Sequence, residues 1–226
     1  MLGPTDVRGL AAQLSLRPTK SLGQNFVIDP GTVRRVAALA LANSPASSPS
    51  ASQPATLPQV VEVGPGLGSL TLALLEAGAS VTAIEIDAIL ARQLPQTVAD
   101  RLPQQAEHLT VLQADAMTVD ALAIPGGSTP TIMAANLPYN IAVPVVLRVL
   151  ERFASIQRIV VMVQAEVADR LAAEPGSRVY GIPSAKRAFY ATARRAGNVS
   201  RSVFWPVPRV DSALVVLERQ QARGNP

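Results

Sequence analysis

The stretch VVEVGPGLGSLTLALLEAG, residues 60–78, decides the fold class. A β-branched apolar run leads into a turn with glycines at 64, 66 and 68, and a leucine-rich helical pattern follows. Strand, glycine turn and helix in that order are typical of a βα unit on a parallel sheet. Glycines in such a turn let a ligand approach the backbone and place amide groups near a helix N-terminus. The stretch therefore predicts an α/β fold with a ligand site at the turn.

The same alternation of strands and helices extends along the chain. We expect five strands in β-branched runs, at 59–64, 80–87, 109–115, 131–136 and 158–164. Helical patterns lie at 30–42, 68–78, 88–102, 142–153, 166–173 and 184–197, and Pro95 is expected to kink or shorten the third of them. Two late apolar runs, 202–207 and 211–218, predict an antiparallel hairpin at the sheet edge.

Composition excludes several kinds of chemistry. The 226 residues include no cysteine and only one histidine, His108. Disulfides, thiolate sites, cysteine nucleophiles, Ser-His-Asp hydrolysis and multi-histidine zinc sites are therefore excluded, and we expect no metal. Neither a signal peptide nor a bilayer-spanning run is recognisable, so we expect a cytoplasmic protein without a membrane partner.

Basic residues gather late in the chain, within a formal net charge of +4. Between Pro175 and Val210 there are seven bases and no acid. Such a cluster suits a polyanion, and the alternative is a solvated basic face. The candidate RNA-binding residues are Lys20 near the N-terminus and Arg178, Lys186, Arg187, Arg194, Arg195 and Arg201.

Acidic residues follow the second and third expected strands. Glu85 lies 21 residues after Gly64, a spacing at which a carboxylate can accept the ribose hydroxyls of a nucleoside. Asp87 is the rival acid, and we expect it to cap the next helix. Asp115 can accept from an adenine amino group, or it caps a helix instead. The G-x-G-x-G turn, with Glu62 just before it, resembles motif I of S-adenosylmethionine-dependent methyltransferases.

The tetrapeptide Asn136-Leu137-Pro138-Tyr139 ends the fourth expected strand. It resembles the (N/D)-(P/L/I)-P-(Y/F) motif of enzymes that methylate exocyclic amino groups or amides. In such a site the Asn136 side-chain oxygen and the Leu137 carbonyl can accept the two N–H groups of an adenine N6, whose lone pair is otherwise delocalised into the ring. Pro138 fixes the turn, and Tyr139 offers a face on which an extruded base stacks. The alternative is a turn with a buried aromatic side chain. We take these four residues as the candidate catalytic set.

Six motifs then occur in a characteristic order: SLGQNFVIDP, VVEVGPGLGSLT, AIEID, ADAM, NLPYNIAVPVV and SVFWPVPRVDSALVVL. From about Lys20 to Leu217 the chain resembles the ribosomal RNA adenine dimethyltransferases, most closely the bacterial small-subunit branch. The resemblance implies a Rossmann-like class I fold with a mostly parallel seven-stranded sheet and an antiparallel edge hairpin. It also implies S-adenosyl-L-methionine as cofactor and dimethylation of N6 on two adjacent adenosines near the 3′ end of 16S rRNA.

The resemblance further implies roles for individual residues. Phe204 is a candidate second stacking partner for the target base beside Tyr139, with core packing as its alternative. The implied cofactor-binding residues are Asn25, Val27, Gly64, Gly66, Glu85, Ile86, Asp115, Ala116 and Asn136. The expected partner is 16S rRNA in the small ribosomal subunit or its assembly intermediate, bound by a monomer.

The expected organisation has three parts. Residues 1–42 form an N-terminal cofactor-covering segment with a helix, residues 43–58 a flexible Ser/Pro/Ala-rich insertion, and residues 59–219 the catalytic domain. The helical C-terminal domain usual in the family is expected to be absent.

Three other functions remain open at this level. A 23S rRNA adenine-N6 methyltransferase of the macrolide-resistance type shares every chemical motif. A protein-glutamine methyltransferase normally has proline where Leu137 stands, and a non-catalytic RNA-binding assembly factor would not need an intact Asn136 and Tyr139.

Overall fold

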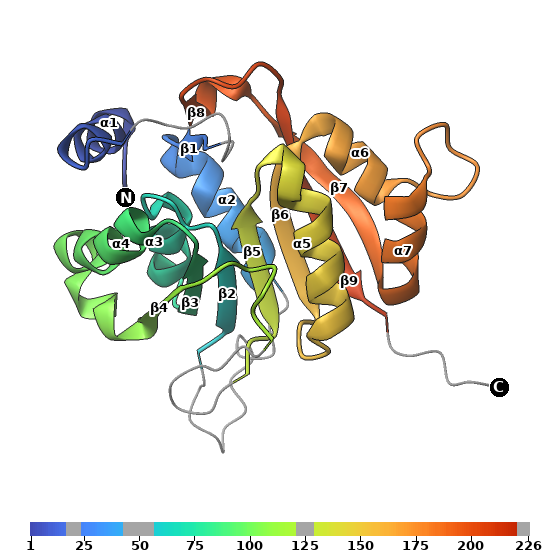
Figure 1. The fold of residues 1–226 in the computed structure, drawn as a ribbon, viewed down its shortest axis with the longest axis horizontal. Helices are drawn as coiled ribbons and strands as arrows, with labels where there is room; N and C mark the ends of the chain where they lie inside the picture. The colour runs from blue at the N-terminus through green and yellow to red at the C-terminus, as the bar shows by residue number, and fades with distance from the viewer. Residues whose placement is uncertain (17–23, 43–56, 121–128, 221–226) are drawn as a thin grey trace.

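A seven-stranded sheet forms the centre of the protein in the computed structural model, which describes residues 1–16, 24–42, 57–120 and 129–220 (Figure 1). Its strand order is β4-β3-β2-β5-β6-β9-β7. The first five of these strands are parallel, and β9 runs antiparallel to both β6 and β7. Their bounds are β2 Gln59–Val63, β3 Ser80–Glu85, β4 Leu109–Gln113, β5 Ile132–Asn136, β6 Arg158–Gln164, β7 Ala191–Val199 and β9 Ser212–Arg219.

Helices cover both faces of the sheet, so the inner strands β2, β3, β5, β6 and β9 are buried on both sides. In β5, Ile132 and Ala134 join one apolar cluster, and Met133 and Ala135 join the other, as the two-residue period of a strand requires. One cluster includes side chains from α1 Pro4–Gln13, α2 Pro30–Leu41, α3 Ser69–Glu76 and α4 Ala88–Arg101. The other includes side chains from α5 Tyr139–Arg152 and α6 Ala165–Ala172, and α7 Ile182–Tyr190 lies on the same side (Figure 1).

The strand order changes direction between β2 and β5. From β2 the chain builds outward through β3 to β4, and from β5 it builds the opposite way through β6. In open α/β sheets, ligands bind beyond the carboxyl ends of the strands at such a switch point. The fold thus places its ligand site between the glycine turn after β2 and the tetrapeptide after β5.

The α/β class and the mostly parallel seven-stranded sheet are confirmed. The prediction that Asp87 caps a helix is also confirmed, because its carboxylate accepts the Ile89 N–H at 2.8 Å at the start of α4. The helix expected at 184–197 is wrong beyond Tyr190, where strand β7 begins. Pairing with the apolar strand β9 overrides the helix propensity of the alanines and arginines there. The helix α1 was not predicted, and Pro95 lies inside α4, which continues to Arg101.

The predicted hairpin between 202–207 and 211–218 is also wrong, because these two segments pair with other strands. Strand β8, Phe204–Trp205, pairs with β1, Phe26–Val27, in a separate two-stranded antiparallel sheet. Prolines at 206 and 208 carry no N–H, which explains why β8 is short. The antiparallel edge of the main sheet is formed instead by β9 and β7.

Two further predictions concern the insertion at 43–58 and the absence of a membrane-spanning segment. Most of the expected insertion at 43–58 lies outside the described residues, as does Lys20. None of the helices among the described residues has the length and apolar character needed to cross a membrane.

Candidate active site

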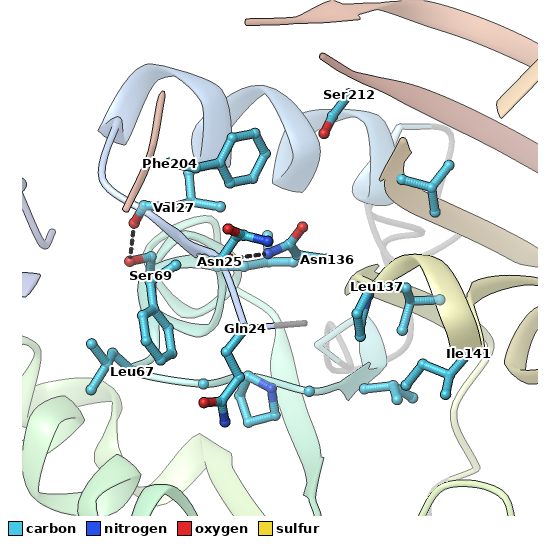
Figure 2. A pocket seen from close by; sticks show the side chains of 18 of the residues that line it. Gln24, Asn25, Val27, Leu67, Ser69, Asn136, Leu137, Ile141, Phe204 and Ser212 are labelled. Atoms are coloured by element: carbon cyan, nitrogen blue, oxygen red, sulfur yellow. Dashed lines mark hydrogen bonds between the residues drawn. The ribbon is translucent and has the colours of Figure 1, made fainter. Parts of the chain in front are cut away.

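A cavity of about 500 Å³ opens at the switch point of the sheet (Figure 2). Its walls come from the glycine turn, the end of β3, the tetrapeptide after β5, and the β1 and β8 strands. Most of the residues predicted for cofactor and catalysis are brought together here: Asn25, Val27, Gly64, Gly66, Glu85, Ile86, Asn136, Leu137, Pro138, Tyr139 and Phe204.

The glycine turn requires glycine for conformational and for spatial reasons. Gly64, Gly66 and Gly68 have φ of +68°, +58° and +96°, in the left-handed region that side chains disfavour. A Cβ on Gly66 would lie 3.1 Å from the Phe26 ring, and one on Gly68 would lie 2.7 Å from Leu94 Cδ1. A Cβ on Gly64 would meet nothing within 4 Å. The backbone at Gly64 is therefore open to a ligand.

Glu85 lines the cavity with only 5% of its surface exposed. Its two carboxylate oxygens accept the Gly66 N–H at 3.1 Å and the Asp87 N–H at 3.0 Å. Burial raises the pKa of Glu85, and these two backbone hydrogen bonds, with a weaker one from Ile86, oppose the rise. A carboxylate has about four acceptor positions, so Glu85 can still accept a hydroxyl group.

Glu62 is a second buried acid beneath the glycine turn, 1% exposed. Loss of hydration raises its pKa to about 8, although the Thr71 hydroxyl donates to its carboxylate at 2.6 Å. The neighbouring charge of Glu85 adds a smaller rise in the same direction. The wall of the cavity therefore contains an acid that is easily kept protonated near neutral pH.

Residues 24–27 are tied across the cavity by two hydrogen bonds (Figure 2). The Asn136 Nδ2 group donates to the Asn25 carbonyl at 2.9 Å, and the Ser69 hydroxyl donates to the Val27 carbonyl at 2.7 Å. The first bond fixes the orientation of the Asn136 amide, since only its nitrogen can donate. Its oxygen has no hydrogen-bond partner among the described residues.

The backbone around Leu137 provides a second acceptor. The Leu137 N–H donates to the Met162 carbonyl at 3.0 Å, which holds the tetrapeptide against β6. Pro138, with φ −65° and ψ 153°, precedes α5, and its carbonyl accepts from Ile141 and Ala142. The Leu137 carbonyl receives no hydrogen bond from the part of the chain that is described. Asn136 and Leu137 therefore offer two neighbouring acceptors.

The two aromatic side chains predicted to stack on the target base lie in the cavity wall at different depths. Tyr139 is 52% exposed as the first residue of α5, whereas Phe204 is 2% exposed and opposite Val27 in the β1–β8 pair. Phe204 belongs to the core, as its packing alternative states, and it also lines the cavity, where stacking on the target base remains a prediction. Phe26 stacks on Trp205 at 6.4 Å between ring centroids and supports this corner.

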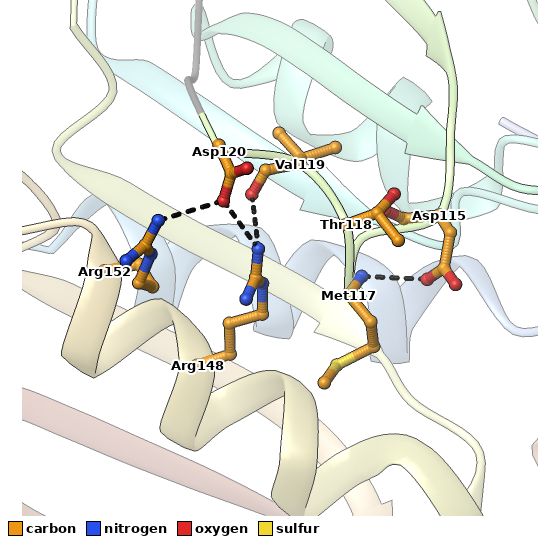
Figure 3. A network of polar contacts seen from close by, with 7 residues as sticks. All are labelled: Asp115, Met117, Thr118, Val119, Asp120, Arg148 and Arg152. Carbon is orange, nitrogen blue, oxygen red and sulfur yellow. Dashed lines mark hydrogen bonds and ion pairs between the residues drawn. The ribbon is translucent and has the colours of Figure 1, made fainter.

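Asp115 and Ala116 are not among the cavity-lining residues. The Asp115 carboxylate accepts the Met117 N–H at 2.8 Å and closes the turn after β4 (Figure 3). The alternative that Asp115 caps a helix is wrong, because a turn and not a helix follows it at 116–118, and contact with an adenine remains a prediction for both residues.

An ion-pair cluster fastens the segment after β4 to α5 (Figure 3). Arg148 donates to the Val119 carbonyl and to the Asp120 carboxylate, both at 3.0 Å. Arg152 reaches the same carboxylate at 3.1 Å. The segment that contains Asp115 is thus held by the helix that begins at Tyr139.

The predicted RNA-binding residues are divided by the structure. Arg187 is 3% exposed and donates to the carbonyls of Leu171, Ala173 and Ala191 at 2.9–3.2 Å, so its assignment to an RNA-binding face is wrong. Arg195 pairs with Asp169. The remaining described members of the set lie at the surface: Arg178, Lys186, Arg194 and Arg201.

The sequence alone did not identify several cavity residues. Gln24 and Phe26 flank Asn25, inside the SLGQNFVIDP motif. Gln164 ends β6 and Ser212 begins β9, opposite each other in the register. Their positions at strand ends next to the tetrapeptide were the available signal. No cluster of three metal-binding side chains occurs among the described residues.

Comparison with known proteins gives a consistent result. Residues 16–225 match the family described as ribosomal RNA adenine dimethylase. The chain is 58% identical to the ribosomal RNA small subunit methyltransferase A of Thermobifida fusca, with 98% of this chain and 72% of that protein covered. It is 56% identical to the protein of the same name from Streptomyces coelicolor, with 97% and 72% covered.

Solved structures show the same fold. A dimethyladenosine transferase from Plasmodium falciparum is 25% identical with a TM-score of 0.67, and 86% of this chain and 63% of that chain are covered. The 23S rRNA methyltransferase ErmE is 27% identical with a TM-score of 0.68, and 86% and 70% are covered.

Proposed function

This chain belongs to the ribosomal RNA adenine dimethylase family, and we propose that it dimethylates N6 of two adjacent adenosines near the 3′ end of 16S rRNA. The observation that carries the proposal is the pair of open acceptors, Asn136 Oδ1 and Leu137 O, beside the exposed ring of Tyr139. The substrate is the small ribosomal subunit or its assembly intermediate, on which the protein acts in the cytoplasm as a monomer. Relatives named for that subunit at 52–58% identity support this choice.

The residues present fit S-adenosyl-L-methionine, the methyl donor of the family. The open backbone at Gly64 and the carboxylate of Glu85 suit the polar parts of a nucleoside, and Ile86 and Leu90 provide an apolar wall. A cavity of about 500 Å³ is within the usual range for such ligands. When bound, the cofactor supplies a methyl group on a positively charged sulfur.

We assign the covering of the cofactor to residues 1–42 and catalysis to residues 59–219. The hydrogen bonds from Asn136 to Asn25 and from Ser69 to Val27 support this division, because they fasten the N-terminal segment over the catalytic domain. Asn25 and Val27 would therefore hold the methyl donor in place and exclude water from their side of the cavity.

The tetrapeptide prepares the target nitrogen. In the first transfer, Asn136 Oδ1 and the Leu137 carbonyl accept its two N–H groups, which draws the lone pair out of conjugation with the ring. In the second transfer, the singly methylated nitrogen has one N–H left for one of these acceptors, and each transfer releases one proton to solvent. Tyr139 stacks on the extruded base, a contact worth about 1–3 kcal/mol per base. The site then has to align the nitrogen with the methyl group, and it does so without a strong general base. His108 lies outside the cavity, at the end of the 3-10 helix Pro103–His108.

The reaction is tested by incubating the protein with S-adenosylmethionine and small subunits that lack the modification, followed by nuclease digestion and nucleoside mass spectrometry. The expected product is N6,N6-dimethyladenosine, at two residues per subunit. Methylation at another atom, or none with the cofactor bound, would refute the proposal. A parallel reaction with large subunits distinguishes the proposed activity from that of a 23S rRNA methyltransferase. The 27% identity to ErmE supports this second activity less than the 58% identity to a small subunit methyltransferase supports the first.

A further inference from the structure

A second hollow, of about 450 Å³, adjoins the rim of the cavity. Gln164 lines both hollows, and Asp211 in the second is followed directly by Ser212 in the first. The two hollows therefore lie next to each other, at the side of the cavity where Gln164 and Ser212 stand. The lining residues of the second hollow are Gln164, Ala165, Glu166, Arg201, Arg209, Val210 and Asp211.

The charged groups of this hollow leave two cations without an acidic partner among the described residues. Glu166 is paired with Arg170 at 2.6 Å, and the Asp211 carboxylate accepts the backbone N–H of Arg201 at 2.9 Å. Arg201 and Arg209 are both exposed, and neither has an ion pair within the described part of the chain. The Arg201 guanidinium lies 3.5 Å from the Arg209 carbonyl, a long and weak contact. Most of their donors are therefore available to a ligand.

The backbone that carries these arginines is well fixed. Pro206 and Pro208 restrict the chain between Phe204 in the cavity wall and Arg209 at the hollow. The Arg201–Asp211 hydrogen bond closes the base of the same loop. The loop thus connects Phe204, whose ring lines the cavity, to Arg201 and Arg209 at the second hollow.

On the basis of the proposed function, we propose that Arg201 and Arg209 bind the RNA phosphate beside the target adenosine. An extruded base enters the cavity while its sugar and phosphate stay outside, at the mouth. Two guanidinium groups match a phosphate because each presents parallel N–H donors to its oxygens. The site would orient the extruded nucleotide, in addition to adding affinity for RNA.

The test compares Arg209→Ala and Arg201→Ala with a matched control, Arg194→Ala. Arg194 is an exposed arginine in β7 that lies outside both hollows and has no ion pair among the described residues. Binding of unmethylated small subunits is measured by filter retention at several salt concentrations, together with kcat and KM. We expect each mouth variant to weaken binding about 10-fold and to lower the slope of log K against log salt by about 1.

Several outcomes are distinguishable. Affinity for S-adenosylmethionine should stay within about two-fold in all three variants, since the arginines lie outside the cofactor cavity. Arg209→Lys should recover part of the affinity but not the full kcat/KM, because lysine keeps the charge and loses the paired donors. Mouth variants that bind and react like Arg194→Ala would overturn the inference. Because binding is measured directly, this comparison remains decisive even if wild-type protein methylates no RNA, a result that would refute the proposed function instead.

Discussion

Replacing Asn136 by alanine removes the side-chain acceptor for the target amine and one hydrogen bond to the Asn25 carbonyl. Loss of one preorganised group that acts in the transition state costs about 10²–10³ in kcat. The structural cost is smaller: one hydrogen bond contributes about 1 kcal/mol to stability, which shifts the melting temperature of a chain this long by about 2–4 °C. We therefore expect near-complete loss of methyl transfer in a protein that remains folded.

The assay measures initial rates of labelled methyl transfer to small subunits, and melting by circular dichroism. Asn198→Ala is the matched control, because the Asn198 amide also makes one side-chain hydrogen bond, to Arg195 at 2.7 Å, on an exposed part of β7. That variant should lose a similar amount of stability and keep its activity. Activity of Asn136→Ala within a few-fold of wild type, or an equal loss in Asn198→Ala, would refute the assigned role.

Three other predictions concern stacking, pH and the buried arginine. Tyr139→Ala should lower rRNA affinity about 5- to 100-fold in binding titrations, whereas Tyr139→Phe keeps the stacking face and should bind within about two-fold of wild type; equal effects would contradict base stacking. Burial raises the pKa of Glu62 from 4.5 to about 8, so the folded protein retains a proton that the unfolded chain releases. The free energy of unfolding should therefore fall between pH 5 and 8, by at most about 1.4 kcal/mol per pH unit, and Glu62→Gln should flatten the slope in urea titrations; an unaltered slope would disprove the shift. Arg187→Met should destabilise the protein by about 3 kcal/mol, because three carbonyls lose their donor, while Lys186→Met should stay within about 0.5 kcal/mol in the same titrations. Similar losses in both would contradict the structural role of Arg187.

The parallel part of the fold was predictable because its strands are short β-branched runs separated by helical patterns. The five expected strands overlap β2 to β6, with ends that differ by at most two residues. The site was predictable for a related reason. The carboxyl ends of parallel strands meet at one edge of the sheet, so residues such as Gly64, Glu85 and Asn136 had to converge once the strand order was given.

Other features depend on contacts between distant parts of the chain. The β1–β8 pair joins Phe26 to Trp205 through strands of two residues each, which leave no periodic signal. Strand β7 is rich in alanine and arginine and becomes a strand only against β9. Arg187 lies among several basic residues that the sequence does not distinguish from one another. Only the structure shows that its guanidinium is buried and donates to three backbone carbonyls.

Methyl addition to two adjacent adenosines of the small-subunit RNA is the central claim, and primer extension tests it most directly. Unmethylated small and large subunits are incubated in parallel with the protein and S-adenosylmethionine, and each RNA is then reverse-transcribed. We expect stops at two neighbouring adenosines near the 3′ end of 16S rRNA and none on 23S rRNA. Stops on 23S rRNA alone, or at scattered positions in 16S rRNA, would contradict the claim.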